Sequence, residues 1–210
     1  MDKYLPNNYK LNLNNEIYTI ERKIGNGATC AAYLAEHNNQ HYIIKEYCPS
    51  FIAFTRDDDG MICFIDEKQR SKFESGLTNF RKSFDRQIEI REILDIQNST
   101  PFTDKRCNCN NTEYFIVVPY NGNTYGRIID EKSITERIEI CCTIAKTALK
   151  YHNAGFLMLD IKPENVFVLP ETNELILYID YDSIRTEKEL MFGNSMSYTK
   201  MGSTGTVESI

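Results

Sequence analysis

A group of charged and amide side chains interrupts an apolar stretch between Leu157 and Phe167. The sequence there, LMLDIKPENVF, places Asp160, Lys162 and Asn165 between apolar residues on either side. Polar groups held between apolar anchors lose their contacts with water, so they are costly unless they hydrogen-bond or bind something. A carboxylate, an ammonium and an amide at this spacing therefore predict a binding or catalytic loop.

Three further features flank this loop in a fixed order. A turn with Gly25 and Gly27 lies between two short apolar stretches, Lys45 lies inside an apolar strand pattern, and Asp180 follows the apolar run LILYI. Each is weak alone, because many turns contain two glycines and a lysine near a strand end usually reaches solvent. Together with DIKPEN, their order resembles the catalytic domain of eukaryotic-type serine/threonine protein kinases, in a bacterial-like variant.

The resemblance implies transfer of the γ-phosphate of ATP to Ser or Thr hydroxyls, with Mg²⁺. Asp160 would accept or orient the proton of the acceptor hydroxyl, and Lys162 would steady the transferring phosphate by its charge. Lys162 also favours Ser/Thr over Tyr acceptors within the family. Asn165 and Asp180 would be the metal ligands, because hard oxygen donors suit Mg²⁺.

The nucleotide side of the site comes from the first half of the chain. Backbone amides at Gly25 and Gly27 would approach phosphate oxygens, since no Cβ stands in the way. Lys45 would face the α- and β-phosphates. Two further positions of the resemblance, Val118 and Tyr120, would line the adenine pocket.

The glutamate that would pair with Lys45 belongs to the helical segment expected over residues 69–97, as one long helix or two. Glu89 is the preferred partner, because Ile90, Ile93 and Ile96 follow it at the spacing of a helix packed between two lobes. Glu92 is the second choice.

The sequence departs from the family pattern at several places. The family's His-Arg-Asp is replaced by Met158, Leu159 and Asp160, and Met158 and Leu159 are expected to anchor the loop by packing. The Asp-Phe-Gly motif becomes Asp180, Tyr181 and Asp182. The resemblance covers about residues 17–206, and we expect a domain truncated after the start of the activation segment.

The surrounding pattern predicts an α+β, bilobal kinase-like fold: a small antiparallel β lobe with one main helix, and an incomplete, mainly helical second lobe. The expected parts are a loosely held polar extension (1–16), the small lobe (17–118), a hinge (119–124) and the partial large lobe (125–210). Residues 98–113 are expected to form a loop.

A second helix is predicted over residues 133–153. Ser133 and Glu136 fit a capping box, in which each side chain satisfies the other's backbone amide. One face of this helix carries Ile134, Ile138, Cys141, Cys142, Ala145 and Leu149. We expect this face to lack part of its packing partner, which would leave an apolar patch.

Composition limits the function classes. The 210 residues are 41% hydrophobic and 26% charged, with a net charge of −6 and no dense basic stretch, which argues against nucleic-acid and membrane partners. Seven cysteines, with no export signal recognised, are expected as free thiols in a cytoplasmic protein. Oligomeric state and protein substrate stay open.

Two other functions remain as alternatives. One is a pseudokinase that binds nucleotide or acts as a scaffold without transfer. The other is a small-molecule phosphotransferase of the aminoglycoside or choline kinase type, which shares the Asp…Asn…Asp order but usually lacks the Lys-Pro-Glu-Asn run.

Overall fold

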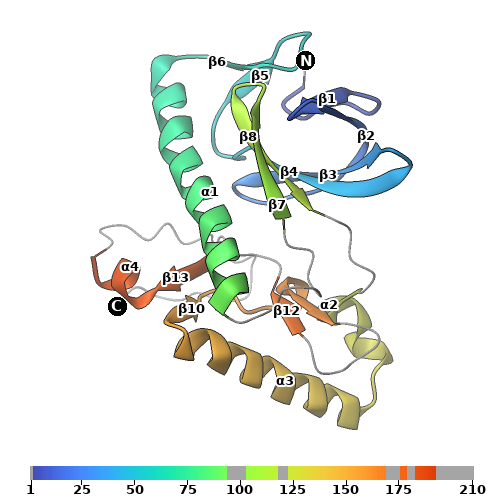
Figure 1. Ribbon diagram of the computed structural model, residues 1–210, viewed down its shortest axis with the longest axis vertical. Helices are drawn as coiled ribbons and strands as arrows, with labels where there is room; N and C mark the ends of the chain where they lie inside the picture. The colour runs from blue at the N-terminus through green and yellow to red at the C-terminus, as the bar shows by residue number, and fades with distance from the viewer. Residues whose placement is uncertain (1, 94–102, 118–122, 169–175, 179–182, 193–210) are drawn as a thin grey trace.

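The computed structural model describes residues 2–93, 103–117, 123–168, 176–178 and 183–192. Figure 1 shows a sheet-rich lobe above and a smaller lobe of helices and short strands below, with helix α1 (Glu67–Ile93) running from one to the other. The α+β, two-lobe architecture predicted from the sequence is confirmed.

The upper lobe is built on one six-stranded antiparallel sheet in the order β1-β2-β3-β4-β8-β7. Its strands are β1 (Lys10–Leu13), β2 (Glu16–Asn26), β3 (Cys30–His37), β4 (Gln40–Tyr47), β7 (Thr103–Cys109) and β8 (Thr112–Val117). A separate hairpin joins β5 (Phe54–Arg56) to β6 (Ile62–Phe64). The apolar core of this lobe lies on both faces of the sheet. Tyr47 and Phe115 face α1, whereas a second group that includes Ile20, Ile44 and Ile116 lies on the opposite face.

Three hairpins of this sheet close through adjacent asparagines. The pairs are Asn14 and Asn15, Asn38 and Asn39, and Asn110 and Asn111, and all six residues have a positive φ. Two-residue turns need positive φ at both positions to match the twist of the strands, and asparagine tolerates this better than other residues with a Cβ. The asparagines therefore set the register of the sheet.

Two expectations for this lobe were wrong. Residues 98–113 were expected as a loop, but Thr103–Cys109 pairs with β8 as an edge strand, turned back by Asn110 and Asn111. The segment 1–16 was expected to be loosely held, but it contributes β1 and buries Leu5, Leu11 and Leu13. Both segments are rich in polar residues because one face of each is exposed to solvent, and this composition led to the wrong expectations.

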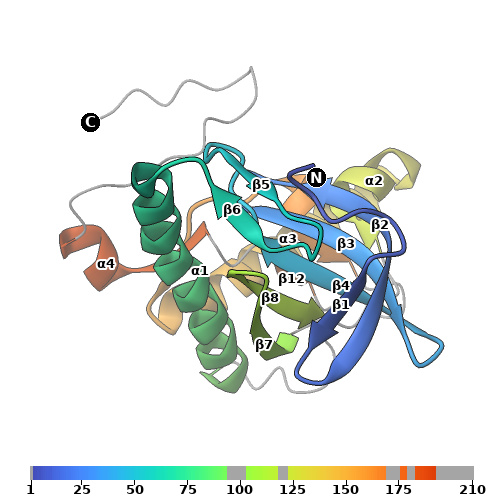
Figure 2. The same cartoon turned by 90° about the horizontal axis from the view of Figure 1, so that it is seen from above.

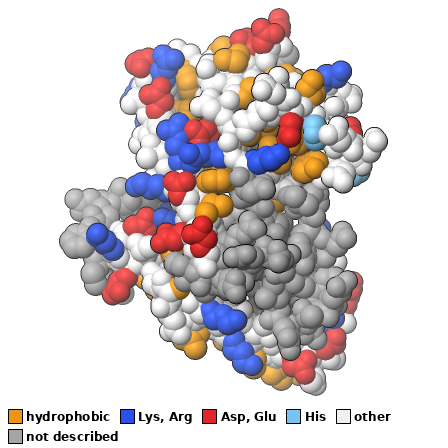
Figure 3. Space-filling model, viewed as in Figure 1, with side chains coloured by type: hydrophobic (Ala, Val, Ile, Leu, Met, Phe, Trp, Pro, Cys, Tyr) orange, Lys and Arg blue, Asp and Glu red, His pale blue; other side chains and the backbone are white. Residues whose placement is uncertain are grey.

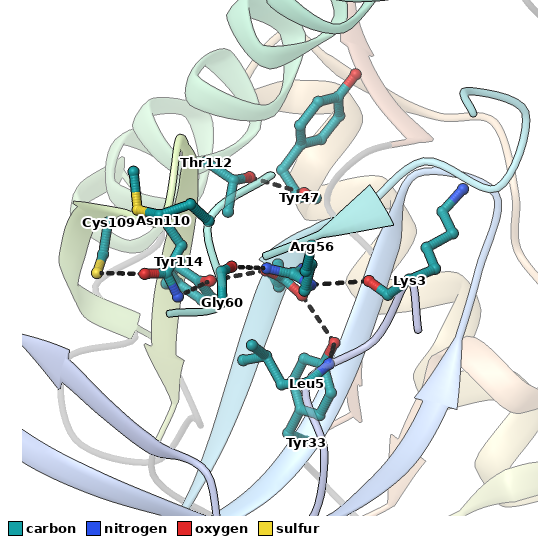
Figure 4. A network of polar contacts seen from close by, with 12 residues as sticks. Lys3, Leu5, Tyr33, Tyr47, Arg56, Gly60, Cys109, Asn110, Thr112 and Tyr114 are labelled. Carbon is teal, nitrogen blue, oxygen red and sulfur yellow. Dashed lines mark hydrogen bonds and ion pairs between the residues drawn. The ribbon is translucent and has the colours of Figure 1, made fainter. Parts of the chain in front are cut away.

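A buried polar network ties the N-terminal segment to the sheet (Figure 4). The Glu46 carboxylate is inaccessible to solvent and accepts hydrogen bonds from Arg56 Nη2 (2.5 Å), Tyr114 OH (2.7 Å) and Tyr33 OH (2.7 Å). Arg56 also donates to the backbone oxygens of Lys3 and Gly60. Removing one member of such a buried pair typically costs about 3–5 kcal/mol, because it leaves the other charge uncompensated.

Helix α1 packs along the sheet next to β7 and β8 (Figure 2). Phe80 of α1 stacks on Phe115 of β8 with ring centroids 4.0 Å apart, and Phe73 contacts Tyr47 edge-on. Farther along the helix, Ile90 is fully buried in the second core, which lies in the lower lobe. A single helix thus contributes to both cores.

The lower lobe contains short strands around α3 (Ile134–Asn153). Its other elements are β9 (Asn123–Thr124), α2 (Tyr125–Ile128), η1 (Ile129–Glu131), β10 (Phe156–Met158), η2 (Pro163–Asn165), β11 (Val166–Val168), β12 (Ile176–Tyr178), β13 (Ile184–Thr186) and α4 (Glu187–Phe192). The predicted capping box is confirmed, since Ser133 Oγ accepts from Glu136 N while Ser133 N donates to Glu136 Oε2. Within the described ranges, no helix is both long and apolar enough to cross a bilayer.

Candidate active site

The loop between β10 and β11 brings three predicted site residues together. Asp160 Oδ2 accepts a hydrogen bond from Lys162 Nζ at 2.6 Å and another from Asn165 Nδ2 at 3.0 Å. Asn165 Nδ2 also donates to the Asp160 backbone oxygen at 3.1 Å. A carboxylate that accepts from both an ammonium and an amide is held in one orientation, because these bonds are directional and one is charge-assisted.

The backbone of the loop is fixed at both ends. Phe156 of β10 and Val166 of β11 are buried in the second core, and Asn165 N donates to Lys162 O across the short η2 turn. Leu159 was expected to be an apolar anchor and is instead 48% exposed. Anchoring therefore comes from the strands on either side and not from the residue next to Asp160.

Sequence reasoning missed the packing of α2 beneath this loop. A Cβ added at Gly126 would lie 3.3 Å from Pro163 Cβ, so glycine permits close contact between α2 and η2. Strand β9, just before α2, pairs with β11 through Thr124 and Phe167. The only sequence signal was a glycine at the start of a helix, which by itself is not distinctive.

The phosphate-binding candidates lie on the sheet of the upper lobe. Gly25 pairs with Ala32, and Ala32 pairs with Lys45, so the three residues form one row across β2, β3 and β4. Residues directly opposite each other in a sheet project to the same face. Lys45 and Tyr47 are two residues apart in β4, so they also project to one face, and Tyr47 contacts Phe73 of α1 there. The half-buried Lys45 side chain therefore lies on the side of the sheet that α1 covers.

The two glycines differ in their setting. Gly25 lies within β2, whereas Gly27 begins the turn and its amide donates to Cys30 O at 2.8 Å. A Cβ added at either position would meet no heavy atom within 4 Å. The space next to both glycines is therefore open.

Neither proposed glutamate partner of Lys45 is buried. Glu89 and Glu92 are both exposed on α1, whereas Gln87 and Ile90 are buried on its inner side. The pairing of Lys45 with Glu89 or Glu92 therefore stays a prediction.

Three predicted site residues, Val118, Tyr120 and Asp180, lie outside the described residues. Asn165 is the metal-ligand candidate that can be placed. Its Nδ2 is engaged by Asp160, which leaves the amide oxygen as the atom of the type that Mg²⁺ prefers. In the described part of the chain, no cluster of three or more His, Cys, Asp or Glu side chains has the arrangement of a metal site.

A contact that the sequence did not reveal joins α1 to the segment after Asp180. Arg86 Nη2 donates to Glu189 Oε1 of α4 at 2.6 Å, and the Arg86 side chain is only 8% exposed. Burial by itself would raise the pKa of Glu189, but the Thr186 amide and Arg86 outweigh it, so the pKa is lowered. Helix α4 is thereby attached to the helix that covers the sheet.

Comparison with solved structures places this arrangement in a known fold. The chain superposes on PpkA-294 in its apo form with a TM-score of 0.64 and 22% identity, over 87% of this chain and 63% of that one. It superposes on the BubR1 kinase domain with a TM-score of 0.58 and 17% identity, over 90% and 53% of the two chains. The chain therefore has the protein kinase catalytic-domain fold and spans about half to two thirds of these two structures.

Sequence comparison gives no match. No protein-family model matches the chain, and no curated protein matches it. At these identities the structural likeness defines the fold alone, so the activity has to be argued from the side chains.

Proposed function

We propose that this chain is an ATP- and Mg²⁺-dependent protein kinase domain that transfers the γ-phosphate to Ser or Thr hydroxyls. The observation that carries the proposal is the convergence of Lys162 and Asn165 on the Asp160 carboxylate. A carboxylate fixed in this way is suited to accept a proton from an acceptor hydroxyl. Phosphoryl transfer requires little beyond such positioning and charge.

Each residue then has a defined task. As the acceptor oxygen bonds to the γ-phosphorus, the bond from that phosphorus to the ADP oxygen breaks and the hydroxyl proton moves to Asp160. Lys162 supplies positive charge next to this carboxylate, where negative charge gathers. Asn165 orients Asp160 through Nδ2 and offers its amide oxygen to Mg²⁺, which would neutralise phosphate charge when bound. Lys45 and the open glycine turn would hold the phosphates in place.

A second function, nucleotide binding without transfer, is favoured by one observation. Glu89 and Glu92, the two glutamates predicted to orient Lys45, are both exposed on α1. A protein in which no glutamate orients Lys45 would still bind Mg-ATP through the remaining groups, and would transfer phosphate poorly.

The deciding experiment follows labelled γ-phosphate from Mg-ATP to the chain itself and to a basic acceptor protein. Asp160→Asn is expected to reduce transfer by about 100-fold or more, the usual range for a lost general base. Asp130→Asn is the matched control, because it makes the same chemical change at an exposed site in η1 and should leave transfer unchanged.

Thermal stabilisation by Mg-ATP, measured in parallel, separates the two functions. Stabilisation together with Asp160-dependent transfer supports the kinase. Stabilisation without transfer supports nucleotide binding alone. Transfer that persists in Asp160→Asn would contradict the assigned role of Asp160.

A further inference from the structure

Helix α3 carries apolar side chains on two different faces. Ile140 and Tyr151 point into the second core and are 1% exposed. A second row, which we call the α3 stripe, consists of Ile134, Ile138, Cys142, Ala145 and Leu149. Its spacing of three and four residues places the row on one side of the helix over nearly its whole length.

The α3 stripe is exposed. Ile134 is 76% exposed, and Ile138 and Leu149 are each 58% exposed; Cys142 and Ala145 are exposed as well. Helix α3 forms the lower edge of the molecule, with no described element beyond it, and hydrophobic side chains appear along that edge (Figures 1 and 3). A continuous apolar row of this kind usually marks an interaction surface.

Charges beside the stripe change sign along the helix. Glu139 flanks its N-terminal half, whereas Lys146 and Lys150 flank its C-terminal half, and all three side chains are exposed on the same flank. In two parallel copies of α3 this flank would face the opposite flank of the partner helix, so these three charges would not meet one another. Two antiparallel copies would place Glu139 of each copy within about one helical turn of Lys146 of the other.

We propose that the α3 stripe is the interface of an antiparallel, two-fold symmetric homodimer of this chain. Such an interface is self-complementary, as the stripe and its flanking charges are. The midpoint between Ile134 and Leu149 falls between residues 141 and 142. A two-fold axis there brings Ile134 of one copy next to Leu149 of the other and places the two copies of Cys142 face to face. The proposal does not depend on phosphate transfer.

Sedimentation velocity of the full chain, from dilute to concentrated solution, tests the interface. The wild type is expected to show a concentration-dependent dimer, and Ile138→Asp is expected to weaken dimerisation by about tenfold or more, because it places a charge in the apolar row. Ile65→Asp is the matched control, since Ile65 is 69% exposed ahead of α1 and outside the stripe. Circular dichroism confirms that the variants are folded.

Charge reversal tests the antiparallel orientation. Glu139→Lys and Lys146→Glu are each expected to weaken the dimer, and the double variant is expected to restore it, because the opposite charges again face each other. A double variant weaker than both single variants would overturn the proposed pairing.

Mild oxidation supplies an independent measurement. A disulfide-linked dimer is expected to form in the wild type and in Cys63→Ser, whose thiol is exposed elsewhere, and to be lost in Cys142→Ser. A monomer at all concentrations would overturn the proposal, and the stripe would then be a surface that binds a different polypeptide segment. A dimer unaffected by Ile138→Asp, or a crosslink through Cys63, would overturn it equally.

Discussion

The residues most informative at the smallest scale are those whose side-chain positions are fixed by close polar partners. Asp160, Lys162 and Asn165 form one such group, and all three were identified from the DIKPEN segment alone. Glu46 belongs to another: it lies next to Lys45 in the strand but points to the opposite face and joins the buried network with Arg56. Neighbours in a strand thus differ in setting: Lys45 belongs to the proposed site, whereas Glu46 is buried in the core.

Burial in this network also determines reactivity. Burial, with the nearby Glu46 carboxylate as a second cause, raises the pKa of the Cys48 thiol to about 12. A thiol with so high a pKa carries almost no thiolate near neutral pH, and the thiolate is the nucleophilic form. Cys48 therefore behaves as a small core residue, whereas Cys63 and Cys142 are exposed.

The capping box of α3 gives a prediction at the residue scale. Hydrogen bonds from the Ser133 side chain and amide, together with Lys132, lower the pKa of Glu136 to about 2. Because this folded-state pKa is below the unfolded value of about 4.3, the cap contributes stability above pH 4.3 and loses it as the pH falls toward 2. In Ser133→Ala, the Glu136 midpoint measured by NMR titration is expected to rise toward 4.3.

Thr135→Ala is the control for that titration, because Thr135 is exposed beside the cap and takes no part in it. It should leave the Glu136 midpoint where it is in the wild type. An unchanged midpoint in Ser133→Ala would mean that Ser133 is not what lowers the pKa.

At the scale of elements, the sheet depends on its asparagine turns. A β-branched residue at a position with φ near +60° is strained, whereas glycine is not. Asn39 has φ +60° at the β3–β4 turn, which precedes the strand that carries Lys45. Asn39→Val is expected to lower the free energy of unfolding by about 1 kcal/mol or more, measured by urea denaturation.

Two companion variants make this prediction specific. Asn39→Gly is expected to change stability by less than about 0.5 kcal/mol, since glycine adopts the same conformation readily. Gln40→Val introduces the same side chain one residue later, within β4, where β-branched residues are favoured. Equal losses for Asn39→Val and Gln40→Val would argue that backbone strain is not the cause.

At the scale of the whole molecule, α1 couples the two lobes. Its Phe80 stacks on Phe115 in the sheet, whereas its Ile90 is fully buried in the lower core. The ion pair of Arg86 with Glu189 adds a polar link from the same helix to α4. A shift of α1 would therefore change contacts both at the sheet face that carries Lys45 and at the segment after Asp180.

Ile90→Ala tests this coupling. Removing a fully buried isoleucine side chain typically costs about 2–5 kcal/mol, and hydrogen exchange is expected to accelerate in α3 and β10 as well as in α1. Ile24→Ala removes the same atoms from a side chain that is 42% exposed and should cost less than about 0.5 kcal/mol. Faster exchange confined to α1 would show that the lobes unfold independently.

Much of the site and fold could be predicted because the relevant signals are local. The loop around Asp160, the capping box at Ser133 and the strand carrying Lys45 depend on residues a few positions apart. The edge strand Thr103–Cys109 was missed because most of its residues are polar, so the alternation of apolar and polar residues typical of a strand is weak. Its extended conformation depends on pairing with β8. Glu89 was chosen from apolar spacing, which identifies a helix but does not say which of its carboxylates face inward.

The sequence by itself therefore determined the two-lobe class, the order of the site motifs and the residues that meet at Asp160. Only the tertiary structure decided that the segment from residue 2 to residue 16 packs against the sheet and that Glu46 and Arg56 form a buried pair. The reason is physical. Local geometry follows from residues that are neighbours in the sequence. Burial depends on contacts between segments that are far apart in the chain, and the sequence pattern does not show which of these segments come into contact.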